Sequence, residues 1–236
     1  MTYQDNISIM NIMKRQRRSK DIGIEGFAAR WYDKNTKKNR LSEMKSYAQE
    51  VSKHLSDDGS SVLEVAPGPG YLAIELAKLG NNFDVVGLDI SNDFIEIARK
   101  NAREAGVNVE FRQGSVAQIP YSDNKFDFII CTAAFKNFKE PLKALSEMHR
   151  VLKKSTGTAL IIDMNRNATN HQIEDYISRS LGVKWLERVF FGFIFKYILR
   201  NGAYTRDEFI SLISKTAFTS HEIREEGIGL YVYLKK

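Results

Sequence analysis

The stretch Val62-Leu-Glu-Val-Ala-Pro-Gly-Pro-Gly-Tyr71 indicates how this chain folds. An apolar run of β-forming residues ends in a Gly-Pro-Gly turn, and a helical pattern starts at Tyr71. A strand that passes through such a turn into a helix leaves unpaired backbone N–H groups and little side-chain bulk, so a ligand can approach closely. The stretch therefore predicts a strand, a ligand-binding turn and a helix.

Outward from this stretch, β-rich runs alternate with helical patterns. The strand-like runs cover residues 62–65, 84–89, 107–111, 126–130, 159–162, 220–224 and 229–234, and the helical patterns cover residues 71–79, 94–105, 141–152 and 205–216. Such alternation is typical of a mostly parallel sheet covered by helices on both faces. We therefore expect an α/β, doubly wound fold with a mostly parallel, seven-stranded sheet.

The charge is unevenly distributed along the 236 residues. The formal net charge is +6, yet residues 1–40 hold ten basic and four acidic side chains, while residues 41–236 hold twenty-five of each. We predict a flexible basic leader over residues 1–24 and a single domain over residues 25–236. The balanced charge of the domain argues against a polyanionic substrate such as nucleic acid.

Cysteine and histidine usage bounds the chemistry. The single cysteine, Cys131, excludes an internal disulfide framework and a cysteine-rich metal site, and it suggests a reducing, cytoplasmic location. The four histidines show no ligand spacing, so we expect no metal. Cys131 also lacks the preceding proline and adjacent base that accompany an activated thiolate nucleophile, which favours a small residue at a strand end instead.

Residues 168–204 form a longer connection than a sheet crossover requires. They include the run Val189-Phe-Phe-Gly-Phe-Ile-Phe195, which is far shorter than the ~18 apolar residues that a membrane span needs. We interpret the segment as a helical cap that covers an acceptor pocket, with Phe191 and Phe195 as candidate substrate contacts. Its apolar faces leave a dimer contact or a peripheral membrane contact as alternatives.

Two carboxylates accompany the glycine-rich turn. Glu64 lies within the first strand, and Asp89 ends the second strand, where an acidic side chain can accept both hydroxyls of a ribose. Gly68-x-Gly70-x-x-Ala73 also satisfies the dinucleotide fingerprint, so a nicotinamide-dependent reductase is an alternative. Glu64 and the two prolines of the turn oppose it, because a diphosphate needs backbone N–H donors and no nearby carboxylate.

Together with these residues, the run Ile119-Pro-Tyr-Ser-Asp-Asn-Lys-Phe-Asp127 resembles class I S-adenosylmethionine-dependent methyltransferases over residues 27–164. Phe135-Lys-Asn137 and the helix behind it are similar to the ubiquinone/menaquinone C-methyltransferases. Lys136 stands where that group usually has arginine, and Ser115 where an aspartate often contacts adenine. The resemblance implies a Rossmann-like methyltransferase fold with amino-terminal helices, and a small-molecule acceptor.

The resemblance also implies roles for individual residues. Glu64 would contact the methionine amino group through water, Asp89 would hold the ribose, and Tyr32 would lie close to the sulfonium. The remaining cofactor contacts would come from the turn and from the neighbouring strand ends: Ala66, Pro67, Gly68, Gly70, Ile90, Ser115, Val116, Cys131 and Thr132. Phe135 and Asn137 are candidate acceptor contacts, and Asn137 could instead cap the helix that follows.

The implied reaction is direct displacement at the sulfonium methyl, which converts S-adenosylmethionine into S-adenosylhomocysteine. Because the sulfonium already activates the methyl group, the protein mainly aligns the reactants and excludes water. The sequence singles out no catalytic base. Methylation of RNA or DNA guided by the basic leader, and a non-catalytic protein that binds the cofactor or docks a partner, are the alternative functions.

Overall fold

The computed structural model describes residues 20–56, 59–80, 82–179, 181 and 185–236. Most of the predicted basic leader therefore lies outside the described residues. Within the described part of the chain, no helix is both long enough and apolar enough to cross a bilayer.

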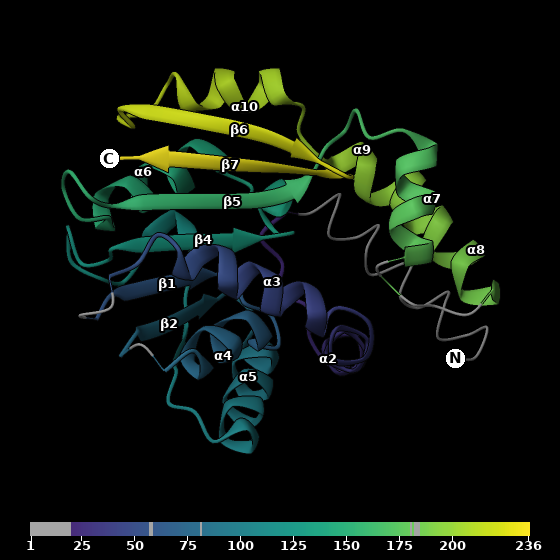
Figure 1. The fold of residues 1–236 in the computed structure, drawn as a ribbon, viewed down its shortest axis with the longest axis horizontal. Helices are drawn as coiled ribbons and strands as arrows, with labels where there is room; N and C mark the ends of the chain where they lie inside the picture. The colour runs from purple at the N-terminus through teal and green to yellow at the C-terminus, as the bar shows by residue number, and fades with distance from the viewer. Residues whose placement is uncertain (1–19, 57–58, 81, 180, 182–184) are drawn as a thin grey trace.

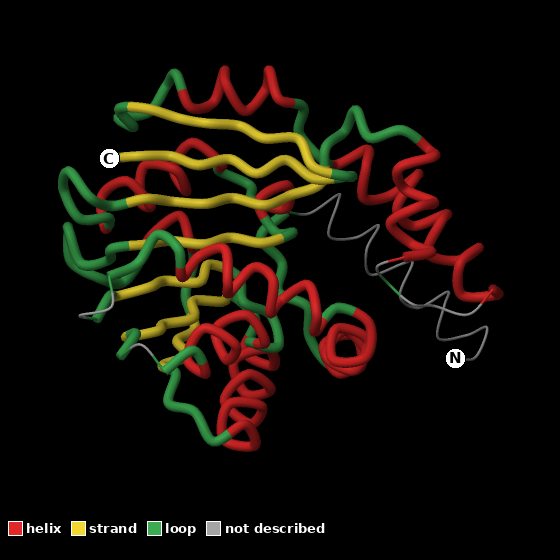
Figure 2. The backbone as a smooth tube through the Cα atoms, viewed as in Figure 1, coloured by secondary structure: helices red, strands yellow, loops and turns green. Residues whose placement is uncertain are grey.

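The centre of the molecule is a seven-stranded sheet with the order β3-β2-β1-β4-β5-β7-β6 (Figures 1 and 2). The strands are β1 (Ser61–Val65), β2 (Asp84–Asp89), β3 (Glu110–Gln113), β4 (Phe128–Thr132), β5 (Thr158–Met164), β6 (Ser220–Glu226) and β7 (Gly229–Lys235). β7 runs antiparallel to both of its neighbours, and the other pairings are parallel. The predicted fold class is confirmed.

Helices cover both faces of the sheet. One face packs against α3 (Leu41–Ser52), α4 (Tyr71–Lys78) and α5 (Asn92–Ala105), and the other against α6 (Pro141–Val151) and α10 (Arg206–Ile213). Because each face buries its own apolar cluster, the central strands read as nearly continuous hydrophobic runs rather than as alternating ones. An additional helix, α2 (Phe27–Asn39), precedes α3.

Local signals set several helix ends. The Ser91 side chain accepts a hydrogen bond from the Phe94 N–H at the start of α5, and Gly106 ends α5 in the left-handed conformation. The N–H of Val107 returns to the Ala102 carbonyl, which completes this helix end. Val107 is therefore part of the helix end, and β3 begins at Glu110, later than the predicted 107–111 strand.

A helical segment follows β5 at the carboxyl ends of the parallel strands (Figure 1). It consists of α7 (Asn170–Arg179), α8 (Trp185–Phe193), a π-helix, η3 (Ile194–Leu199), and the short α9 (Arg200–Gly202). Its apolar side chains form a third cluster, separate from the two that flank the sheet. The segment thus has its own small core and lies over the end of the sheet where ligands bind in α/β proteins.

We predict that Gly70→Ala destabilises the protein more than Gly80→Ala. Both glycines have positive φ angles, so each alanine substitution lowers the free energy of unfolding by about 1 kcal/mol because it forces a left-handed backbone on alanine. A Cβ on Gly70 would lie 2.7 Å from the Phe111 ring, whereas one on Gly80 meets no atom within 4 Å. The overpacked variant should lose a further ~1–3 kcal/mol in urea unfolding. Equal losses for the two variants would contradict the packing explanation.

Candidate functional site

A cavity of about 780 Å³ opens at the carboxyl ends of the parallel strands. Its walls come from α2 and α3 on one side, from the ends of β1, β2, β4 and β5 on the floor, and from the helices after β5 on the remaining side. The strap formed by residues 20–24 also lines it. The strap is attached at both ends, because Asp21 N–H donates to the Asn137 carbonyl and Ser91 Oγ donates to the Ile24 carbonyl.

The turn after β1 has an unusual backbone. Ala66, Gly68 and Gly70 have φ angles of 56°, 55° and 80°, in the left-handed region. This conformation lets the Ala66 N–H reach the Leu88 carbonyl at 2.8 Å and the Gly68 N–H reach Asp89 Oδ2 at 3.0 Å. The turn is thereby attached to the end of β2, and its backbone forms part of the cavity floor.

Glu64 is almost completely buried in this floor, with 2% of its surface exposed. Its Oε2 accepts a hydrogen bond from the Ala73 N–H at 2.9 Å, while Oε1 accepts none from the residues that the structure describes. Burial raises the pKa of Glu64 to about 8, and the nearby carboxylate of Asp89 adds to the shift. A buried carboxylate oxygen without a donor is suited to a cationic ligand.

Asp89 is the second buried carboxylate, at the end of the adjacent strand. Its Oδ1 accepts from the Ser91 N–H at 2.9 Å and its Oδ2 from the Gly68 N–H. Burial raises its pKa to about 6. Within the described residues, neither Asp89 nor Glu64 forms an ion pair with lysine or arginine. Because buried charges are normally paired, these two carboxylates point to a ligand rich in N–H and O–H donors.

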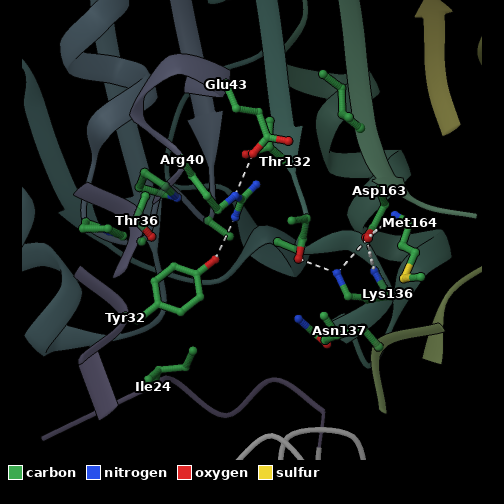
Figure 3. Close-up of a pocket in the computed structure, with 18 of the residues that line it drawn as sticks. Ile24, Tyr32, Thr36, Arg40, Glu43, Thr132, Lys136, Asn137, Asp163 and Met164 are labelled. Carbon is green, nitrogen blue, oxygen red and sulfur yellow. Dashed lines mark hydrogen bonds and ion pairs between the residues drawn. The ribbon is translucent and has the colours of Figure 1, made fainter. Parts of the chain in front are cut away.

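A polar cluster lies at the junction of α2 and α3, on the opposite side of the cavity from Lys136 and Asp163 (Figure 3). Arg40 donates from Nε to Glu43 Oε2 at 2.7 Å and from Nη1 to the Tyr32 hydroxyl at 3.3 Å. The other oxygen of Glu43 accepts from the hydroxyls of Tyr47 and Tyr176, at 2.9 and 3.1 Å. Burial raises the pKa of both tyrosines, so they remain hydrogen-bond donors.

Arg40 was not predicted as a site residue, because it follows a helix without any motif around it. Its Nη2 has no hydrogen-bond acceptor among the described residues, and the side chain lines the cavity. The Tyr32 ring beside it packs edge-on against Phe94 at 5.6 Å and lies near Gly68. Tyr32 is therefore placed over the glycine-rich turn, in the region expected from the sequence.

A buried ion pair forms another part of the wall. Lys136 Nζ lies 2.7 Å from Asp163 Oδ1, and the side chains are only 6% and 1% exposed. The backbone N–H of Lys136 donates to Asp163 Oδ2 at 2.9 Å. Both residues line the cavity: Lys136 lies in η2 (Phe135–Asn137), the short 3-10 helix after β4, and Asp163 lies near the end of β5.

The structure brings most of the predicted contacts to one cavity. Beside the two carboxylates and the turn residues Ala66, Pro67 and Gly68, its lining includes Tyr32, Ile90, Ser115, Val116, Thr132, Asn137, Phe191 and Phe195.

Three predicted residues lie elsewhere. Gly70, at the end of the turn, does not line the cavity and packs against the Phe111 ring and Ala98. Cys131 and Phe135 are fully buried in the apolar cluster beneath the sheet, and neither lines the cavity. Cys131 is paired across the sheet with Val65 on β1 and Ile161 on β5, and the side chains of all three residues belong to this cluster. Burial raises the pKa of the Cys131 thiol, which keeps it protonated. The neighbours Thr132 and Lys136 line the cavity instead.

Comparison with known proteins identifies a family. The family model described as "Methyltransferase domain" matches residues 56–189, which include the turn, both carboxylates and Lys136. A demethylmenaquinone methyltransferase from Deinococcus radiodurans is 36% identical over 91 residues, which make up 39% of this chain and 38% of that protein. The chain thus spans less than half the length of this curated relative. The family predicted from the sequence is confirmed.

Solved structures share the fold. A SAM-dependent methyltransferase from Aquifex aeolicus superposes with a TM-score of 0.62 at 22% identity, covering 82% of this chain and 97% of that one. The plantazolicin methyltransferase BpumL, solved with a substrate analogue and SAH, gives a TM-score of 0.65 at 18% identity and covers 97% and 99%. These similarities extend the shared fold beyond residues 56–189.

We predict that Glu64→Gln stabilises the ligand-free protein. The folded-state pKa of about 8 lies above the ordinary value of 4.5, so the folded protein binds more protons than the unfolded chain between these pH values. Wild-type stability should therefore fall as pH rises through this window, by on the order of 3 kcal/mol at pH 7.

Glutamine carries no charge and keeps an acceptor for the Ala73 N–H, so the variant should have a flatter profile of unfolding free energy against pH. A smaller decline should persist up to pH 6 because of Asp89. Denaturant titrations at several pH values measure both effects. Parallel profiles for variant and wild type would contradict the raised pKa of Glu64.

Proposed function

The chain belongs to the methyltransferase-domain family, and on that premise we propose that it is an S-adenosylmethionine-dependent methyltransferase for a small, apolar or aromatic acceptor. The observation that carries the proposal is the pair of buried carboxylates, Glu64 and Asp89, which have no cationic partner within the described residues. A nucleoside that bears an ammonium group satisfies both of them. A dinucleotide would instead bring a diphosphate close to two carboxylates.

The residues at this end of the cavity fit the cofactor. The free Oε1 of Glu64 can accept an N–H from the amino group, and Asp89 retains lone pairs for the ribose hydroxyls. Ile90 and Val116 provide apolar surfaces for adenine, and Ser115 lies at its edge. When bound, the cofactor supplies a methyl group on a positively charged sulfur.

Arg40 completes this end of the cavity. Glu43, which accepts from Tyr47 and Tyr176, and the Tyr32 hydroxyl hold its guanidinium in one orientation. Its Nη2 has no acceptor among the described residues and is available toward the cavity. A planar guanidinium matches a carboxylate in geometry and charge. We therefore assign Arg40 to the carboxylate of the methionine moiety, opposite the ammonium that Glu64 accepts.

The other end of the cavity is suited to the acceptor. The helices after β5 contribute apolar and aromatic side chains, among them Phe191, Ile194, Phe195 and Ile198. We propose that these helices form a cap over the acceptor, which would exclude water from the reacting atoms. The named relative acts on demethylmenaquinone, and a quinone-like ring is one acceptor of suitable character. We place the enzyme in the cytoplasm, as the composition suggested.

Two measurements test the proposal. Calorimetric titration should show that S-adenosylhomocysteine binds and that NADH does not. Incubation with S-adenosylmethionine carrying a labelled methyl group and fractionated cell extract should then transfer label to a small molecule. Label recovered in RNA or protein would contradict a small-molecule acceptor. Binding of NADH without binding of S-adenosylhomocysteine would overturn the proposed function.

We predict that Arg40→Met weakens binding of S-adenosylmethionine by about tenfold to a hundredfold, the loss of one charge-assisted hydrogen-bonded contact. Decarboxylated S-adenosylmethionine lacks the carboxylate, so its affinity should be the same for variant and wild type. Arg40→Lys keeps the charge, so its affinity for S-adenosylmethionine should lie between those of the wild type and Arg40→Met. Thermal unfolding checks that each variant folds. A similar loss for both ligands would show that Arg40 supports the cavity without contacting the carboxylate.

A further inference from the structure

Lys136 is a buried ammonium in the wall of the acceptor end of the cavity (Figure 3). Its Nζ donates to the Ala133 carbonyl and to Asp163 Oδ1. An ammonium has three N–H bonds, so one is left without an acceptor among the residues that the structure describes. In Figure 3 the ammonium points toward the space that Arg40 and Tyr32 face from the opposite side.

The surroundings of Lys136 fix the direction of this N–H bond. Asp163 accepts from the Lys136 ammonium, from the Lys136 backbone N–H and from the Met164 backbone N–H. The carboxylate is therefore held by three donors and holds the ammonium in turn. A buried ion pair is costly unless its remaining polar groups are satisfied, so the unpartnered N–H indicates that a ligand completes the pair.

Few other charges influence this position. Cys131 and Tyr204 lie within electrostatic reach of the pair, and burial raises the pKa of both, so they stay neutral. Among the other charged residues of the wall, Arg40 is paired with Glu43.

Four further charged residues complete the wall: Lys20, Asp21, Arg179 and Glu226. Lys20 and Asp21 belong to the strap, where Asp21 Oδ1 accepts from the Lys139 N–H. Arg179 ends α7 and Glu226 ends β6, whereas Lys136 follows β4, the strand next to β1. Lys136 thus lies between the proposed cofactor end and the apolar cap.

We propose that Lys136 binds the acceptor through an anionic oxygen, so that the acceptor is an apolar, ring-sized molecule with one acidic oxygen group, a phenol or a carboxylic acid. This inference rests on the proposed function. Phe191 and Phe195 in the cap accommodate the apolar body of the acceptor. The Lys136 ammonium pairs with the anionic oxygen, which the apolar body cannot stabilise. The acidic proton leaves to solvent water when the acceptor binds. The oxygen is then already deprotonated, and the protein needs no separate base at this step.

Two probes distinguish the sources of the anionic oxygen. 4-Nitro-1-naphthol carries an ionisable hydroxyl whose anion is coloured, and 1-naphthoate carries a carboxylate. 1-Nitronaphthalene has a similar apolar body without an acidic group and serves as the neutral control. Each is titrated into the full chain with S-adenosylhomocysteine present, using wild type, Lys136→Met and Lys136→Arg.

In wild type, the pKa of bound 4-nitro-1-naphthol should be lower than in buffer by about one unit or more, as expected for an opposite charge at close range. Lys136→Met should abolish this pKa shift and lower the affinity for the anionic probe by at least about tenfold. Lys136→Arg should restore much of both effects. The affinity of 1-nitronaphthalene should be unchanged throughout.

Lys136→Met leaves Asp163 buried without its partner, so the double variant Lys136→Met, Asp163→Asn provides a neutral pair of similar shape. It should fold, bind S-adenosylhomocysteine and 1-nitronaphthalene as wild type does, and lose the preference for the anion. A Lys136-dependent preference for either anionic probe supports the proposal and identifies the oxygen class. If neither probe binds in a Lys136-dependent way, the proposal fails, and intact S-adenosylhomocysteine binding would show that the proposed function survives it.

Discussion

The structure is organised around two buried carboxylates that have no cationic partner among the described residues. Glu64 lies one residue before the end of β1 and Asp89 ends β2, the parallel neighbour of β1, so the two carboxylates lie close together in a region with little water. Such charges oppose folding, and the chain offsets part of the cost with backbone N–H donors from Ala73, Gly68 and Ser91. The left-handed turn between β1 and α4 orients one of these donors, the Gly68 N–H, toward Asp89. The protein thus accepts lower stability at the point where it gains a binding site.

The two ends of the cavity use opposite electrostatics. At the β1 and β2 end, Glu64 and Asp89 have no cationic partner among the described residues. At the β4 and β5 end, Asp163 holds the Lys136 ammonium, which keeps one N–H without an acceptor among those residues. The apolar helices after β5 lie beyond this second end. Tyr176 on α7 donates to Glu43 on α3, and Lys38 on α2 lies 3.9 Å from Glu187 on α8. The cap is therefore attached to the amino-terminal helices across the cavity.

Local sequence was sufficient for the sheet, the turn and the two carboxylates. Hydrophobic runs between glycine and N-cap signals indicate strands and helices because each pattern reports on neighbours a few residues away. The same reasoning misplaced Gly70, Cys131 and Phe135. Their positions next to the site in sequence are correct, but which side chains near a strand end turn to the core depends on what packs beneath the sheet. There, α6 and α10 supply the apolar partners.

The sequence by itself determined the fold class, the ligand-binding turn and the acids at the ends of β1 and β2, since these follow from hydrophobic periodicity and from the backbone freedom of glycine. Only the tertiary structure decided the roles of Arg40 and Lys136. Arg40 becomes a fixed donor because Glu43 is held by Tyr176, a residue 133 positions away, and Lys136 is buried against Asp163, 27 positions away. Charge, burial and orientation at these sites come from contacts that no local pattern specifies.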